Sequence, residues 1–331
     1  MDAALRPMST SQVLDRTFHL YRNNFVLFAG ITIVAPGLSL LAGFVQLGVF
    51  GLPVMPQPGA FDPGALQKLL VQSVIGAILG LIFYAIGQAL ATGATMHAVS
   101  MVHLGKTTTI QESYRTIKPI FWSILRIIAA IFLRAFSPLV LAYVLLFAIA
   151  FAAPGLVKAS AGPQLGLALL IVLGGLLSLA AFAGGVIWAI YAYTRYALAI
   201  PACVLEKLTP KASLIRSKFL SNGSLGRIMA VYLLTAVMAF VLSSVLQIPA
   251  YIFGGNIFSL KGGAQISSSF VFWTYLGSFL GRTLAGPIAT IAIALVYYDQ
   301  RVRKEAFDLQ LMMQSLEPMS QAHAASSSSL A

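Results

Sequence analysis

Charged side chains are scarce in this sequence. Only 9% of its 331 residues are charged, whereas a soluble domain carries about a quarter. Hydrophobic residues make up 59% of the chain, and the mean hydropathy is +0.88. This balance excludes a water-soluble globule and predicts a helical membrane protein with several spans.

Acidic residues and cysteine are scarcer still. The chain has 9 Asp and Glu against 21 Lys and Arg, and no carboxylate falls inside a predicted span. Because proton relays use intramembrane acids or histidines, this absence argues against an ion-coupled pump. The single cysteine, Cys203, excludes an intramolecular disulfide and a Cys-rich metal site. His97 and His103 lack carboxylate companions, which favours interfacial polar residues over metal ligands.

Catalytic motifs are also missing. The sequence contains no P-loop, no nucleophile elbow, no HExxH and no paired carboxylates of the hydrolase kind. We therefore predict no enzyme, no cofactor and no metal site. The net charge of +12 would suggest nucleic acid in a soluble protein, but these basic residues lie beside apolar spans. We predict anionic lipid headgroups as the partner, a membrane protein as a further candidate, and no nucleic acid.

Six long apolar runs dominate the chain. Each exceeds the roughly 20 residues that cross a bilayer core, and they cover residues 25–50, 65–103, 120–153, 164–204, 223–253 and 270–298. Amphipathic stretches precede every second span, at residues 9–23, 109–118 and 209–222, and are typical of interfacial helices. We predict an all-α polytopic membrane protein with one transmembrane domain, 1–310, and a cytoplasmic tail, 311–331, disordered at its end.

Glycine and proline divide these runs. Segments rich in both predict outer loops at 51–64, 154–163 and 254–269. Pro36 predicts a break in the first span. The pairs Gly174–Gly175 and Gly184–Gly185 predict close approach of helices in the fourth span.

The unit of amphipathic helix, span, loop and span occurs three times. Arg16, Arg115 and Arg216 occupy similar points of the three short helices, 99 and 101 residues apart. A true internal duplication explains this pattern, and so does a six-span protein with short amphipathic connectors.

The stretch 291–310 orients the chain. It passes from apolar residues through Tyr297 and Tyr298 into a charged run, and aromatic rings prefer the headgroup level while basic clusters stay cytoplasmic. With both termini cytoplasmic, 16 of the 21 Lys and Arg lie inside and three, Lys68, Lys158 and Lys261, lie outside. This asymmetry follows the positive-inside rule.

The remaining two basic residues, Arg134 and Arg282, lie within spans. At ~1.5 Å per residue, both are about 20–25 Å from the cytoplasmic ends of their helices. A charge at that depth is costly without a partner. One interpretation is snorkelling, or bonds to carbonyls freed near Pro138 and Pro287. The other is a site for a lipid phosphate or another anion, which a guanidinium fork suits.

Candidate salt bridges cluster at the predicted cytoplasmic helix ends. We expect them to lock these ends together, with a regulatory or partner-binding surface as the alternative. The residues are Arg195, Glu206, Arg216, Asp299 and Arg301.

Three segments carry a family resemblance: QVLDRTFHLYRNNF at 12–25, RYALAIPACVLEKLTPKASLIRSKFLSNGSLGRI at 195–228 and YYDQRVRKEAFDLQ at 297–310. Together they resemble bacterial multi-span proteins of the glycerophosphoryl diester phosphodiesterase membrane-domain type. The resemblance implies a bacterial inner membrane protein. In the name-giving enzymes a separate soluble barrel carries the chemistry. We expect no such barrel here, since 33 residues follow Tyr298, and no catalytic residue carries over.

The favoured hypothesis is a non-enzymatic inner-membrane protein that binds or organises lipid or a membrane partner. The alternative is a transporter or channel for an anionic or amphipathic solute, based on Arg134, Arg282 and the repeat-like layout. Phosphodiester hydrolysis is a third hypothesis.

Overall fold

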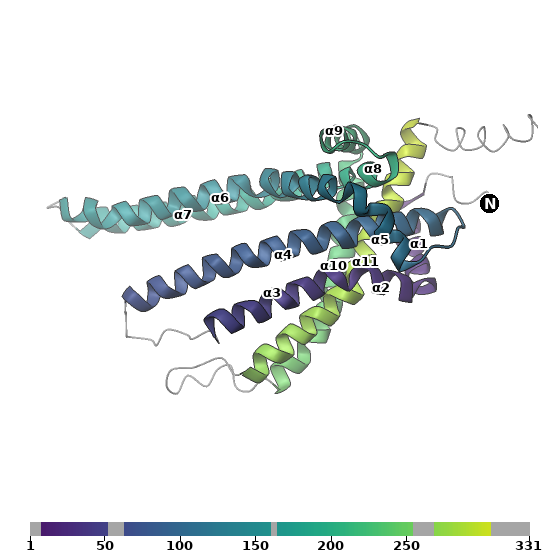
Figure 1. The fold of residues 1–331 in the computed structure, drawn as a ribbon. Helices are drawn as coiled ribbons and strands as arrows, with labels where there is room; N and C mark the ends of the chain where they lie inside the picture. Colours follow the sequence, from purple (N-terminus) through teal and green to yellow (C-terminus); the bar gives the residue numbers. More distant parts are fainter. Residues whose placement is uncertain (1–7, 52–62, 160–163, 254–267, 306–331) are drawn as a thin grey trace, which may run out of the picture.

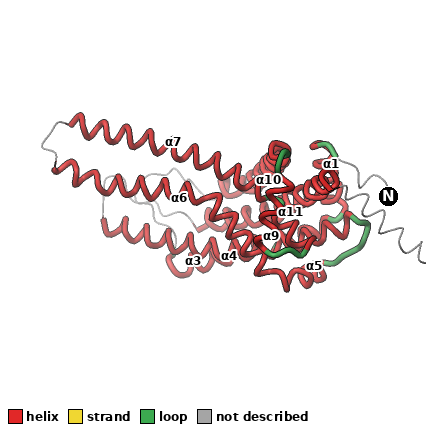
Figure 2. Tube along the Cα trace, turned by 90° about the horizontal axis from the view of Figure 1, so that it is seen from above, coloured by secondary structure: helices red, strands yellow, loops and turns green. Residues whose placement is uncertain are grey.

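The computed structural model describes residues 8–51, 63–159, 164–253 and 268–305. Helices and short turns account for all of these residues, and they contain no strand (Figure 2). Six stretches are long and apolar enough to cross a membrane. The predicted all-α, six-span architecture is therefore confirmed, and the chain is a multi-pass membrane protein. The predicted tail, 311–331, lies outside the described residues.

The chain forms eleven α-helices within the described ranges (Figure 1). They are α1 (Thr10–Asn23), α2 (Phe25–Thr32), α3 (Val34–Phe50), α4 (Pro63–His103), α5 (Ile110–Ile117), α6 (Phe121–Ala159), α7 (Gln164–Tyr196), α8 (Ala199–Glu206), α9 (Pro210–Ser221), α10 (Leu225–Phe253) and α11 (Ser268–Glu305). A short 3-10 turn, Lys118–Ile120, joins α5 to α6. The short helices α1, α5 and α9 each precede a pair of long segments, as the three-fold pattern predicts.

Short helices gather at one end of the molecule. We call α1, α5, α8 and α9 the collar, and the last turns of α11 reach the same end (Figure 1). The pairs α3–α4, α6–α7 and α10–α11 run from this end and diverge from one another. Side-chain caps begin each amphipathic helix of the collar: the hydroxyls of Ser9, Thr109 and Thr209 accept hydrogen bonds from backbone N–H groups three residues later.

The core is built around the C-terminal half of α11. This helix packs against α10, α1, α3, α4, α2, α9 and α8, and every residue from Ile291 to Gln300 is buried. Tyr297 has no exposed surface and Tyr298 only 9%. These two rings therefore face the protein core and not lipid, and the boundary that they were expected to mark stays a prediction. They pack inside the protein, with Tyr298 beside the His103 ring at 5.1 Å between centroids.

Two of the predicted spans are interrupted near a proline, the first as predicted and the fourth not. The first span divides at Ile33, three residues before Pro36, because proline has no N–H to donate to a preceding carbonyl. The fourth span was predicted to continue to residue 204, but α7 ends at Tyr196 and α8 starts at Ala199. Pro201 then occupies the first turn of α8, where N–H groups lack helical acceptors anyway.

Pro154, by contrast, does not interrupt a helix. The loop predicted at 154–163 is wrong in its first part, because α6 continues to Ala159. Residues 160–163 lie outside the described ranges, as do 52–62 and 254–267 of the other two predicted loops.

Close helix approach occurs at glycines other than the predicted pairs. Gly174, Gly175 and Gly184 have open space where a Cβ would stand, and only Gly185 packs closely, on Leu139. The tightest backbone approach is between α10 and α11. A Cβ on Gly277 would stand 2.6 Å from the Leu246 carbonyl oxygen, and one on Gly281 would stand 3.0 Å from Ser243 Cα. These two glycines form the small-xxx-small spacing that lets membrane helices touch.

Candidate functional site

Helix α9 shows an unexpected orientation. Its serine face points into the protein, where Ser213 and Ser217 have no exposed surface. Leu214 and Leu220 are buried on the same inner side, whereas Ile215, 67% exposed, and Phe219, 54% exposed, point outward. By contrast, α1 turns its apolar residues inward, since Val13 has no exposed surface. Among the collar helices that were predicted to be interfacial, α9 is the one that presents large apolar side chains on its outer face.

The orientation of α9 follows from the end of α7. The last carbonyls of a helix have no N–H partner within the helix, so they need hydrogen-bond donors from outside it. The Arg195 carbonyl accepts hydrogen bonds from the hydroxyls of Ser217, at 2.9 Å, and Ser221, at 3.2 Å. Two serines of α9 therefore cap α7, which fixes α9 with its serine face inward.

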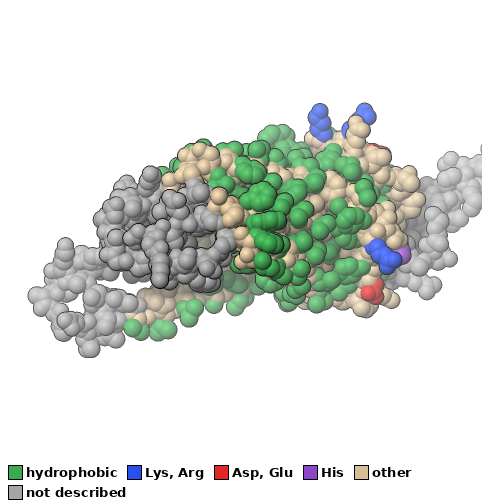
Figure 3. Space-filling model, turned by 90° about the horizontal axis from the view of Figure 1, so that it is seen from below, with side chains coloured by type: hydrophobic (Ala, Val, Ile, Leu, Met, Phe, Trp, Pro, Cys, Tyr) green, Lys and Arg blue, Asp and Glu red, His purple; other side chains and the backbone are tan. Residues whose placement is uncertain are grey.

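Lysines flank the outer face of α9. Lys211 and Lys218 are exposed on the same side as Ile215 and Phe219. Viewed from below, the described surface of the molecule is largely hydrophobic, and its visible charged side chains lie toward the collar end (Figure 3). An apolar strip edged by lysines is the pattern that suits a membrane interface.

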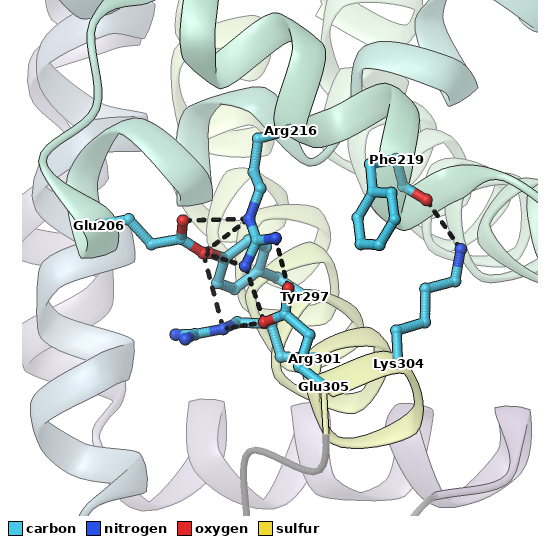
Figure 4. A network of polar contacts seen from close by, with 7 residues as sticks. All are labelled: Glu206, Arg216, Phe219, Tyr297, Arg301, Lys304 and Glu305. Carbon is cyan, nitrogen blue, oxygen red and sulfur yellow. Dashed lines mark hydrogen bonds and ion pairs between the residues drawn. The ribbon is translucent and has the colours of Figure 1, made fainter. Parts of the chain in front are cut away.

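An ion-pair network joins α8, α9 and α11 beneath this face (Figure 4). Arg216 donates to Glu206, with Nη2 3.0 Å from Oε1, and also pairs with Glu305. Arg301 lies 3.2 Å from Glu305 and 3.6 Å from Glu206. The Tyr297 hydroxyl donates to Glu206 from below. Burial lowers the pKa of Arg216, but the hydrogen bonds to Glu305 and Glu206 outweigh it and raise that pKa above its ordinary value.

A second network fixes the N-terminal segment. Asp299 is only 1% exposed and pairs with Arg227 at 3.0 Å and Arg303 at 2.9 Å. The Met8 N–H donates to Asp299 at 2.7 Å, and the Met8 carbonyl accepts from both arginines. Gln300, the next residue, accepts from the Ser224 hydroxyl at 2.9 Å. This network ties Met8, two residues before α1, to α10 and α11.

Four of the five predicted helix-end residues thus make ion pairs, and the fifth, Arg195, makes a different contact. Its guanidinium bonds to the Tyr191 hydroxyl and lies over the Tyr191 ring, 5.6 Å from the centroid. Within the described residues it makes no ion pair. Arg195 lies in the last turn of α7, whereas Glu206 lies beyond the break, at the end of α8, and pairs with residues of α9 and α11.

The two arginines predicted within spans have different surroundings. Arg134 is exposed, donates to the Ala130 carbonyl at 3.2 Å, and lies over the Tyr196 ring at 5.6 Å from the centroid. Arg282 is exposed and has no hydrogen bond or ion pair in the described residues. No polar contact in the described part of the chain joins these two side chains.

Pro287 leaves a carbonyl near Arg282 without its helical N–H partner, but another side chain donates a hydrogen bond to that carbonyl. A proline cannot donate to the carbonyl four residues before it, which is that of Thr283. The Thr32 hydroxyl donates to this oxygen at 3.1 Å. Arg282 therefore does not satisfy the carbonyl that one interpretation assigned to it.

Comparison with known protein families, characterised proteins and solved structures gives no match to this chain. The family resemblance of the three quoted segments therefore stays a prediction. Function must be argued from the geometry alone.

The described residues at this site include charged side chains but few that are placed to act as a general acid or base. Among the described residues no three His, Cys, Asp or Glu side chains gather as a metal site requires. His97 and His103 each bury an Nδ1 atom without a hydrogen-bond partner. The carboxylates Glu206, Asp299 and Glu305 are all held by arginines.

Sequence reasoning missed several members of the two networks. Arg227 and Glu305 complete the ion pairs, and Tyr297 adds a hydroxyl. Part of this was visible in the sequence, because Asp299–Arg303 and Arg301–Glu305 have the i,i+4 spacing of helix ion pairs. Nothing in the sequence pairs Met8 with Asp299, which are 291 residues apart.

Proposed function

We propose that this chain is a non-enzymatic protein of the bacterial inner membrane, with both termini cytoplasmic, that binds anionic lipid headgroups at its collar end. One observation carries the proposal. The outer face of α9 presents Ile215 and Phe219 between the exposed lysines Lys211 and Lys218. Such a face fits a position where apolar side chains enter the acyl boundary and lysines reach the headgroups.

Charge distribution supports the same assignment. By the sequence count, 16 basic residues fall on the collar side of the chain and three on the opposite side. Much of the acid on the collar side is already bound by arginines, as in the Glu206–Arg216 and Asp299–Arg227 pairs. The exposed lysines of α9 therefore remain available to lipid, each contributing about 1 kcal/mol near an anionic surface.

The transporter hypothesis has less support. It was based on Arg134, Arg282 and the repeat-like layout, and no polar contact between described residues joins the two arginines. Arg134 instead turns toward the Tyr196 ring. We therefore keep lipid binding as the proposed function.

Lipid preference tests this proposal. Purified protein is reconstituted in vesicles with spin-labelled phosphatidylglycerol or phosphatidylcholine, and the motionally restricted fraction of each lipid is measured. We expect the anionic lipid to associate several-fold more strongly, at about 1 kcal/mol per basic contact. The double variant Lys211→Gln/Lys218→Gln is expected to lose much of this preference.

The matched control removes the same charge elsewhere. The variant Lys158→Gln/Lys261→Gln neutralises two lysines of the predicted outer side and is expected to keep the preference. Equal association of both lipids with the wild-type protein would contradict the proposed function.

A further inference from the structure

Two cations from different helices share one aromatic ring. Tyr196 is the last residue of α7. The Arg134 guanidinium of α6 lies 5.6 Å from the centroid of its ring, and the Lys218 ammonium of α9 lies 5.5 Å from it. Helices α6, α7 and α9 pack against one another, so the fold brings both charges to the same ring.

Neither cation has an acidic partner in the part of the chain that the structure describes. Within the described residues Arg134 and Lys218 make no ion pair, whereas Arg216, Arg227, Arg301 and Arg303 all do. Two like charges at one ring repel each other, and the repulsion grows where apolar surroundings lower the dielectric. An anion that binds both cations would replace this repulsion with attraction.

The surface around Arg134 is apolar and aromatic. Leu133 of α6 is 67% exposed and Ile187 of α7 is 69% exposed. Trp188 is 47% exposed, and its indole N–H donates to the Arg134 carbonyl at 2.9 Å. A ligand that reaches both cations from this surface therefore needs an anionic group, and an apolar tail would find contact beside it.

We propose that Arg134 and Lys218, held by Tyr196, form a binding site for a phosphate group, carried by an anionic phospholipid or free in solution. A guanidinium fork matches two phosphate oxygens, and an ammonium acts as a point charge on a third. The site deepens the proposed function, since it gives the general attraction of the collar one defined contact. It differs from that function in needing Arg134, which lies on α6 outside the collar.

Binding measured on the purified, delipidated protein tests the site. Phosphatidylglycerol is titrated in detergent and bound lipid is counted by native mass spectrometry, and inorganic phosphate is titrated in a parallel experiment by calorimetry. We expect Arg134→Gln and Lys218→Gln each to weaken binding about tenfold, the effect of losing one charged hydrogen bond. Arg134→Lys should retain part of the affinity, because it keeps the charge and loses the fork.

One matched variant serves as the control. Arg282→Gln removes the other arginine within a span, and Arg282 is exposed. This variant is expected to bind within about twofold of the wild type, since a surface change away from a site has little effect.

The outcomes separate the two ligand sources and the two proposals. Loss of phosphatidylglycerol binding in Arg134→Gln, without competition by inorganic phosphate, supports a lipid phosphate site. Loss of inorganic phosphate binding in the same variant supports a free phosphate site. Wild-type binding of both ligands by Arg134→Gln and Lys218→Gln overturns the site. Equal weakening by Arg282→Gln also overturns it, while leaving the general attraction of the proposed function intact.

Discussion

Replacing Asp299 with asparagine is expected to lower the free energy of unfolding by about 3 kcal/mol, the largest loss among single polar substitutions in this chain. Asp299 is 1% exposed and compensates Arg227 and Arg303. Asparagine keeps the volume but removes the charge, so both arginines lose their counter-ion. Because Arg227 is 19% exposed and Arg303 39%, water reduces the cost to the lower end of the range for broken buried pairs.

The measurement is unfolding by sodium dodecyl sulfate in mixed micelles, followed by circular dichroism. Asp15→Asn is the control, because Asp15 is exposed on α1 and makes no ion pair in the described residues. Its change should stay within about 0.5 kcal/mol. An Asp299→Asn protein as stable as this control would show that the Met8 network contributes nothing.

Replacing Arg216 with glutamine is expected to cost about 2 kcal/mol, for a related reason. Arg216 separates Glu206 from Glu305 and neutralises both. Its side chain is 21% exposed, so the pair is partly screened and weaker than that of Asp299. Without Arg216, two carboxylates face each other with only Arg301 between them.

A double-mutant cycle isolates this interaction. The double variant Arg216→Gln/Glu206→Gln should lose about 1 kcal/mol less free energy of unfolding than the two single variants lose together. This difference is the coupling energy of the pair. Arg115→Gln is the control. It changes the arginine at the similar point of α5, which is exposed and unpaired in the described residues, and should have little effect. Additive losses in the cycle would contradict the network drawn in Figure 4.

The architecture could be predicted from the sequence because it depends on local properties. Apolar runs, capping residues and helix-breaking prolines act within a few residues, so six spans and three short helices follow from them. Errors arose where a distant partner overrides local preference. Pro154 predicted a loop, yet α6 passes through it. Tyr297 and Tyr298 look like boundary residues, yet they lie in the core.

The candidate site was harder to predict for the same reason. On a helical wheel, Ser213, Ser217 and Ser221 lie on one side of α9 and Ile215 and Phe219 on the other, while Leu214 and Leu220 break the pattern, so the wheel alone does not decide which side is buried. The free carbonyl of Arg195 turns the serine side inward, because Ser217 and Ser221 donate to it. Likewise, Arg134 and Lys218 are 84 positions apart in the sequence, and only the packing of α6, α7 and α9 brings them to Tyr196.

The depth of α9 in the bilayer decides whether its outer face contacts lipid. A spin label is placed at Ile215→Cys in a Cys203→Ala background, since Cys203 is the single cysteine. The reconstituted protein is then exposed to oxygen, which concentrates in the acyl region, and to a water-soluble nickel complex. The control label is Asp15→Cys, on the exposed polar face of α1.

We predict that the Ile215 label is relaxed mainly by oxygen in vesicles that contain phosphatidylglycerol, and the Asp15 label mainly by nickel. This result would place the outer face of α9 at the acyl boundary, with Lys211 and Lys218 at the headgroups. Dominant nickel relaxation at both positions would put α9 in water and contradict the account.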